Sequence, residues 1–142
     1  MESRPKIKLP PSPLDNKLEL TSKIFLIVMW ALTLYTFLKS PTIIPTHFNA
    51  SGQADDFGNK LMLLILPLLA TIIYFGLTKL NKYPHIFNYM TRITEDNAEK
   101  QYTIATRILR FLKLAILLIF SLIILFTYLT TIGVTNGLGF WF

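Results

Sequence analysis

Three long apolar runs separated by polar segments dominate the pattern of the chain. They are IFLIVMWALTLYTFL at 24–38, LMLLILPLLATIIYFGLT at 61–78 and LAILLIFSLIILFTYLTTIGV at 114–134. A helix needs roughly 20 mostly apolar residues to cross the hydrocarbon layer, and lysines beside a shorter run can extend to the interface. The pattern therefore predicts an all-α integral membrane protein in which the whole chain forms one membrane domain. Its three transmembrane helices are expected over residues 24–39, 61–79 and 114–134.

The basic residues predict the orientation of these helices. Of the 14 lysines and arginines, five precede the first run, seven lie between the second and third runs, and two lie between the first and second. Cytoplasmic loops carry the excess of Lys and Arg in membrane proteins. We therefore place the tail and helix start (1–23) and the link with its amphipathic stem (80–113) in the cytoplasm. The loop (40–60) and the aromatic end (135–142) are expected outside it.

Composition narrows the function classes. Charged residues make up only 15% of the chain, and the net charge of +6 needs no nucleic-acid partner because basic residues beside a membrane attract anionic lipid. The chain has no cysteine, which excludes disulfides, thiolate metal sites and thiol nucleophiles. It also lacks H-E-x-x-H, G-x-S-x-G and P-loop motifs, and the three apolar runs hold no charged residue. We therefore expect neither an enzyme nor a transporter, and no cofactor.

Local signals set the ends of the helices. Ser12 can cap a helix that has Pro13 at its first position and Asp15 reaching back, so the first helix should begin within the tail. Pro67 lies inside the second run and predicts a kink there. Thr94 begins a pattern that looks helical without a breaker through the third run.

The predicted cytoplasmic stem carries basic residues at helical spacing. The basic face consists of Lys100, Arg107, Arg110 and Lys113, with Thr103 on the same side. One interpretation is a stem that lies along the lipid headgroups. The other is a docking face for a partner protein, which charge reversal at Arg107 and Arg110 would disrupt while leaving membrane insertion intact.

The polar stretch PTHFNASGQADDFGNK, residues 45–60, joins the first two apolar runs. Asn49 and Gly52 favour a tight turn, and Asp55 or Asp56 can cap the second helix, whose dipole favours negative charge. On this interpretation the stretch is an ordered structural loop.

The same residues also permit three functional interpretations. A divalent metal would use one nitrogen and two oxygens, from His47, Asn49 and Asp55. His47 alone could sense protons. The loop could instead recognise an extracytoplasmic peptide or protein.

This stretch, with the two isoleucines before it, resembles the signature I-P-x-H-F/W-N-x-x-G-x-x-D…G-x-K of a bacterial membrane family of unknown function. The signature occurs at the start of SdpI-like proteins, which confer immunity to a sporulation-delaying toxin, and in small stand-alone membrane proteins. The matched positions are Pro45, His47, Phe48, Asn49, Gly52, Asp55, Gly58 and Lys60. YPHIFNY and ITEDNAEKQY also look like stand-alone members, which often continue into a fourth span after a G-x-G-x-W-F segment.

The resemblance implies a multi-pass protein of the bacterial cytoplasmic membrane. The leading hypothesis is an interaction, sensing or immunity-like protein whose outer loop, centred on the matched positions, binds a ligand, peptide or partner. The alternative is a small accessory subunit of a larger membrane complex, with a purely structural loop. Gly133 and Gly137 form a lone GxxxG that is compatible with an oligomer.

Overall fold

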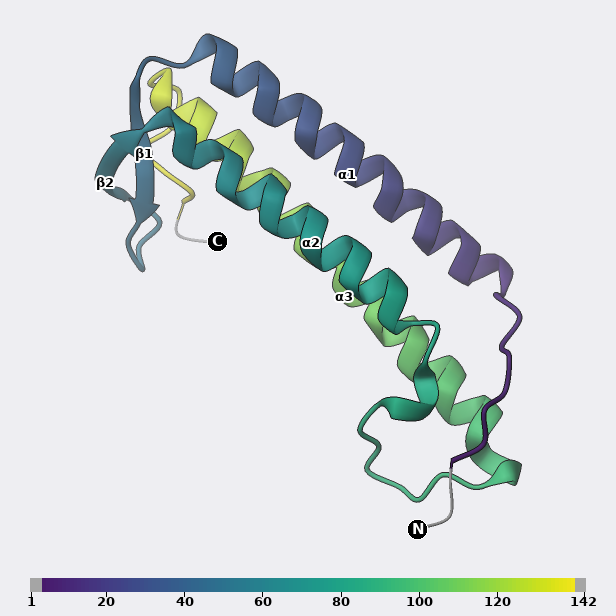
Figure 1. Cartoon of the computed structure of the whole chain (residues 1–142). Coiled ribbons are helices and arrows are strands. Elements are labelled where there is room, and N and C mark those ends of the chain that lie inside the picture. The colour runs from purple at the N-terminus through teal and green to yellow at the C-terminus, as the bar shows by residue number, and fades with distance from the viewer. Residues whose placement is uncertain (1–3, 140–142) are drawn as a thin grey trace.

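A computed structural model describes residues 4–139 and shows three long helices and one small sheet (Figure 1). The helices are α1 (Pro13–Lys39), α2 (Ile65–Leu80) and α3 (Glu95–Thr131). The antiparallel strands β1 (Ile43–Phe48) and β2 (Ala54–Asn59) form a hairpin between α1 and α2, and the 3-10 helices are η1 (Lys60–Leu64) and η2 (Pro84–Ile86). Each long helix, with η1 joined to α2, is long and apolar enough to cross a membrane. The predicted all-α membrane class is confirmed, and the hairpin is a minor addition that we did not predict.

The helix starts follow the capping signals. The Ser12 hydroxyl accepts a hydrogen bond from the Asp15 amide at 3.2 Å, and the Asp15 carboxylate accepts one from the Ser12 amide at 2.9 Å. Thr94 and Asn97 form the equivalent box at the start of α3. These reciprocal bonds satisfy amides that have no partner inside the helix, which explains why both starts were predictable.

The start of the second span differs from the prediction. Pro67 is the third residue of α2, just after η1 changes into the α-helix, so it lies at the start of α2 and not in its interior as we predicted. The capping residue is not Asp55 or Asp56. The Asn59 side chain instead accepts a hydrogen bond from the Leu61 amide at 2.9 Å at the start of η1.

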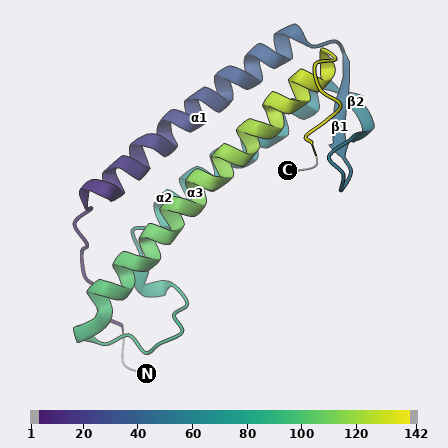
Figure 2. The ribbon, with the colours of Figure 1, turned by 180° about the vertical axis from the view of Figure 1, so that it is seen from behind.

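The helices pack around a narrow apolar core. Met29, Ala70, Leu117 and Ile124 are buried at its centre, and α3 runs beside both other helices over most of its length (Figure 2). The Trp30 indole on α1 donates a hydrogen bond to the Thr71 hydroxyl on α2 at 3.0 Å. Many of the other large apolar side chains of the spans are exposed, as expected for helices that face lipid.

The two ends of the bundle differ in chemistry. The hairpin and the segment after α3 form one end, which we call the hairpin end (Figure 1). The N-terminal segment and the link between α2 and α3 form the other, which we call the charged end. There Arg4 donates hydrogen bonds to the backbone oxygens of His85 and Phe87, and its guanidinium lies 5.5 Å from the centre of the Tyr89 ring. Burial and the neighbouring Tyr102 raise the pKa of Tyr89 to about 12, against the opposing effect of Arg4.

Candidate functional site

The hairpin brings His47 and Asp55 together across its two strands. The pairs Pro45–Phe57 and Phe48–Ala54 keep one register, and a local irregularity at His47 lies between them. His47 Nδ1 lies 2.5 Å from Asp55 Oδ1, and the two side chains are 66% and 43% exposed. A cross-strand pair of this kind is the usual stabilising unit of a hairpin, and here it also presents an imidazole and a carboxylate to solvent.

The turn of the hairpin engages the side chain of Asn49, the third proposed metal ligand. Asn49 Oδ1 accepts hydrogen bonds from the amides of Ser51 at 2.9 Å and Gln53 at 3.0 Å. This is the side-chain turn that asparagine favours. Within the described residues no group of three His, Asp or Glu side chains is placed to hold a metal. Of the predicted set, His47 and Asp55 lie together, whereas the Asn49 side-chain oxygen is occupied by the turn.

The segment after α3 braces the tip of the hairpin. The Leu138 amide donates a hydrogen bond to the Gly52 oxygen at 2.7 Å, and Gln53 pairs with Gly137 in an isolated antiparallel bridge. Gly52 has a φ of +73°, and a Cβ there would lie 2.4 Å from the Gly139 oxygen. A side chain at Gly52 would therefore be excluded both by the backbone conformation and by this close contact.

The other signature residues have structural surroundings. Pro45 is buried, Phe48 is half-buried, and a Cβ on Gly58 would lie 3.0 Å from a Thr46 methyl group. Lys60 Nζ donates hydrogen bonds to the backbone oxygens of Phe37 at 3.1 Å and Ser40 at 3.2 Å.

Lys60 therefore satisfies carbonyl groups at the end of α1, where the helix dipole favours a cation. Of the eight matched positions, His47 and Asp55 are the pair whose side chains are exposed and whose chemistry could serve a ligand.

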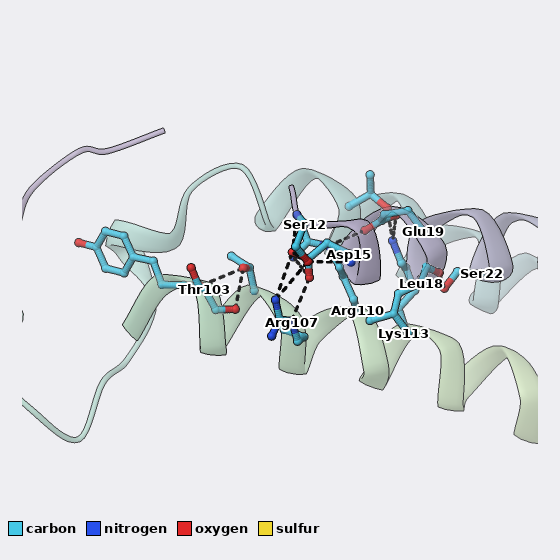
Figure 3. A network of polar contacts seen from close by, with 12 residues as sticks. Ser12, Asp15, Leu18, Glu19, Ser22, Thr103, Arg107, Arg110 and Lys113 are labelled. Carbon is cyan, nitrogen blue, oxygen red and sulfur yellow. Dashed lines mark hydrogen bonds and ion pairs between the residues drawn. The ribbon is translucent and has the colours of Figure 1, made fainter. Parts of the chain in front are cut away.

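At the charged end, the basic face of α3 packs against acidic residues of α1 (Figure 3). Arg107 Nε donates a hydrogen bond to Asp15 Oδ1 at 3.1 Å, and its Nη2 donates one to the Ser12 hydroxyl at 3.2 Å. Arg110 Nε lies 3.2 Å from Glu19 Oε1.

Lys113 also belongs to this network, and its side chain is almost fully buried. Its side chain is 1% exposed, and its Nζ donates hydrogen bonds to Glu19 Oε2 at 2.5 Å and the Thr78 hydroxyl at 2.9 Å. The same ammonium group lies 4.7 Å from the centre of the Tyr74 ring. It therefore contacts both other helices.

These contacts correct the expectation that the basic face of the stem is free to contact lipid headgroups or a partner protein. Arg107, Arg110 and Lys113 hold α3 against α1, and Lys100 is the one predicted member that remains exposed. We missed the network because Asp15 and Glu19 precede the first apolar run. The spacing of these residues was a usable signal. The two acidic residues are four positions apart, and the three basic residues Arg107, Arg110 and Lys113 follow one another at intervals of three. Each set therefore lies on one face of its helix.

The fold and its two ends define a multi-pass membrane protein with an ordered hairpin between its first two spans. Residues 24–71, which cover most of α1, the hairpin and the start of α2, match the model of a family described as a domain of unknown function (DUF1648). An uncharacterized protein of Archaeoglobus fulgidus is 36% identical over 93 residues, an alignment that covers 58% of this chain. The chain spans about half (51%) of the length of that relative. No solved structure matches the chain.

Proposed function

We propose that the protein is a non-enzymatic recognition protein of the bacterial cytoplasmic membrane, whose extracytoplasmic hairpin binds a peptide or a segment of another membrane protein. The observation that carries this proposal is a hairpin whose backbone is fixed and whose polar side chains are exposed. The hairpin tip is held by Asn49 and by the segment after α3, while the His47–Asp55 pair stays accessible. A fixed backbone lowers the entropic cost of binding a ligand.

The chemistry of the exposed surface suits a polypeptide. His47 and Asp55 offer donor and acceptor atoms, and Phe57 and Ile43 are 59% and 57% exposed on the same two strands. Aromatic and apolar side chains beside a few polar groups are common at recognition surfaces. The resemblance of the hairpin sequence to SdpI-like immunity proteins implies the same class of role.

The proposed orientation places the hairpin outside the cytoplasm, in agreement with the distribution of basic residues. Because the chain has no native cysteine, single substitutions can report this directly. We expect Ser51→Cys at the hairpin tip to react with a membrane-impermeant maleimide in intact cells, whereas Lys100→Cys reacts after cell lysis. The opposite labelling pattern would contradict the orientation.

Affinity capture from native membranes tests the recognition role. We expect a partner polypeptide to be retained by wild type and by Asp56→Ala, and lost with His47→Ala. Asp56 is the matched control because it is an exposed neighbour on β2 whose side chain bonds only to the Phe57 amide among the described contacts. A stoichiometric partner that survives His47→Ala would instead support an accessory subunit with a structural hairpin.

A further inference from the structure

A pocket of ≈ 580 Å³ with both polar and apolar lining residues opens at the charged end, where the N-terminal segment, α1, α2 and α3 meet. Its polar lining includes Lys8, Asn16, Glu19, Asn81, Lys82 and Arg110. Three of these side chains are cationic and one is anionic, so the wall carries a net positive charge. The pocket lies at the opposite end of the bundle from the hairpin and is independent of the function proposed for it.

Several polar atoms of this wall make no hydrogen bond among the described residues. Both side-chain polar atoms of Asn81 are buried without a hydrogen bond. Arg110 forms ion pairs with Glu19 and Asp15, but its Nε is buried and makes no hydrogen bond. Lys8 and Lys82 are exposed and form no ion pair within residues 4–139. Glu19, by contrast, already accepts a hydrogen bond from Lys113 at 2.5 Å.

The two unpaired lysines and the unsatisfied atoms of Asn81 and Arg110 favour an anion rich in oxygen atoms. Buried polar atoms are normally satisfied, so the Asn81 amide and Arg110 Nε each call for a ligand atom or water. Guanidinium and ammonium groups bind phosphate oxygens with charge-assisted hydrogen bonds. The amide of Asn81 can donate to and accept from a hydroxyl group beside such a phosphate.

The depth of the pocket points to a lipid as the source of the phosphate. The apolar stretches of the three helices end at Lys23, Thr78 and Lys113, and the lining residues lie at or beyond this level. The polar headgroups of a bilayer occupy this zone. Ile24 and Phe75, which lie one to two turns deeper in the spans, are 50% and 62% exposed and can contact acyl chains.

We propose that this pocket binds the phosphate of an anionic phospholipid headgroup, held by Lys8, Lys82 and Arg110, with Asn81 bonding to the headgroup hydroxyls. A headgroup seated there contacts the N-terminal segment, α1, α2 and α3 together. Bound lipid therefore stabilises the charged end by mass action.

Thermal unfolding of the full chain in detergent micelles tests the proposal, with dioleoyl phosphatidylglycerol added at increasing mole fraction. The test variant is Lys8→Ala/Lys82→Ala, which removes two exposed charges that have no partner in the fold. The matched control, Lys17→Ala/Lys79→Ala, removes two exposed lysines from the same end without touching the pocket. Salt at 0.3 M shortens the screening length to roughly 6 Å and suppresses diffuse attraction.

We expect phosphatidylglycerol to raise the melting midpoint of wild type and of the control. The test variant should need at least about tenfold more lipid for half of the shift. Asn81→Leu should weaken the response as well, without loss of folding, because it removes an amide that has no partner. An equal response of all variants, or an equal response to phosphatidylcholine, would show that the pocket does not bind an anionic lipid. A pocket-dependent shift with inorganic phosphate alone would overturn the lipid assignment.

Discussion

Neutralising Glu19 should destabilise the bundle because it leaves the buried ammonium group of Lys113 without its counter-charge. Lys113 is 1% exposed and its Nζ lies 2.5 Å from the Glu19 carboxylate. The test substitution is Glu19→Gln, which keeps the shape of the side chain and removes the charge. We expect it to weaken the packing of α3 against α1 while all three helices still form.

The structure sets the size of this effect. At an effective dielectric constant of about 20, charges 2.5 Å apart attract by roughly 6.6 kcal/mol, and desolvation of the ammonium group offsets most of this energy. Removing one partner of a fully buried pair costs about 3–5 kcal/mol. Glu19 is 33% exposed and the glutamine oxygen can still accept a hydrogen bond, so we expect a loss of about 2 kcal/mol.

Equilibrium unfolding by SDS in mild-detergent micelles, followed by circular dichroism, measures the change. Glu99→Gln is the charge-matched control, because Glu99 is exposed on α3 and outside the network. Glu19→Gln/Lys113→Met should recover part of the lost stability, since it removes both charges of this pair while Arg110 still loses its contact with Glu19. If Glu19→Gln matched the control, or if the double variant were less stable than Glu19→Gln, the buried pair would not hold the helices as argued.

Three further predictions concern other parts of the molecule. Gly52→Ala should destabilise the protein by about 1–3 kcal/mol because of its positive φ and its close contact, whereas Gly76→Ala, with open space around it, should be neutral or slightly stabilising; equal melting midpoints would contradict this. Stability should fall as the pH rises from about 10 to 12, because folded Tyr89 keeps its proton up to a pKa of about 12 while the unfolded chain releases it near 10; Tyr89→Phe should reduce this fall in pH-dependent unfolding. Zn²⁺ or a chelator should leave the melting midpoint unchanged, and a rise in wild type that His47→Ala/Asp55→Ala abolishes would refute this.

The spans were predictable because their signals are local. Apolar run length and the capping residues Ser12 and Thr94 determine where α1 and α3 begin, and both depend on neighbouring positions alone. The orientation of the helices in the membrane stays a prediction. The exposure of His47 and Asp55 was part of the hypothesis of a recognition loop, whereas their pairing across two strands was not foreseen.

The hairpin and the charged network were missed because both depend on contacts distant in the sequence. The segment ADDFGN has weak strand propensity, and the bridge from Gln53 to Gly137 that braces it spans most of the chain. Asp15 contacts Arg107 only because α1 and α3 pack with these two helix faces turned toward each other. The spacing of the charges marks one face on each helix, but it does not show that these two faces meet.

The contact between the hairpin tip and the segment after α3 has a consequence for the order of assembly. Gly52 emerges from the ribosome long before Gly137 and Leu138, and these later residues are separated from it by the second and third spans. A newly made hairpin therefore lacks its brace until the third helix has been inserted. A chain whose third helix is not yet in place would therefore carry a hairpin without the bridge to Gly137 and the hydrogen bond from Leu138.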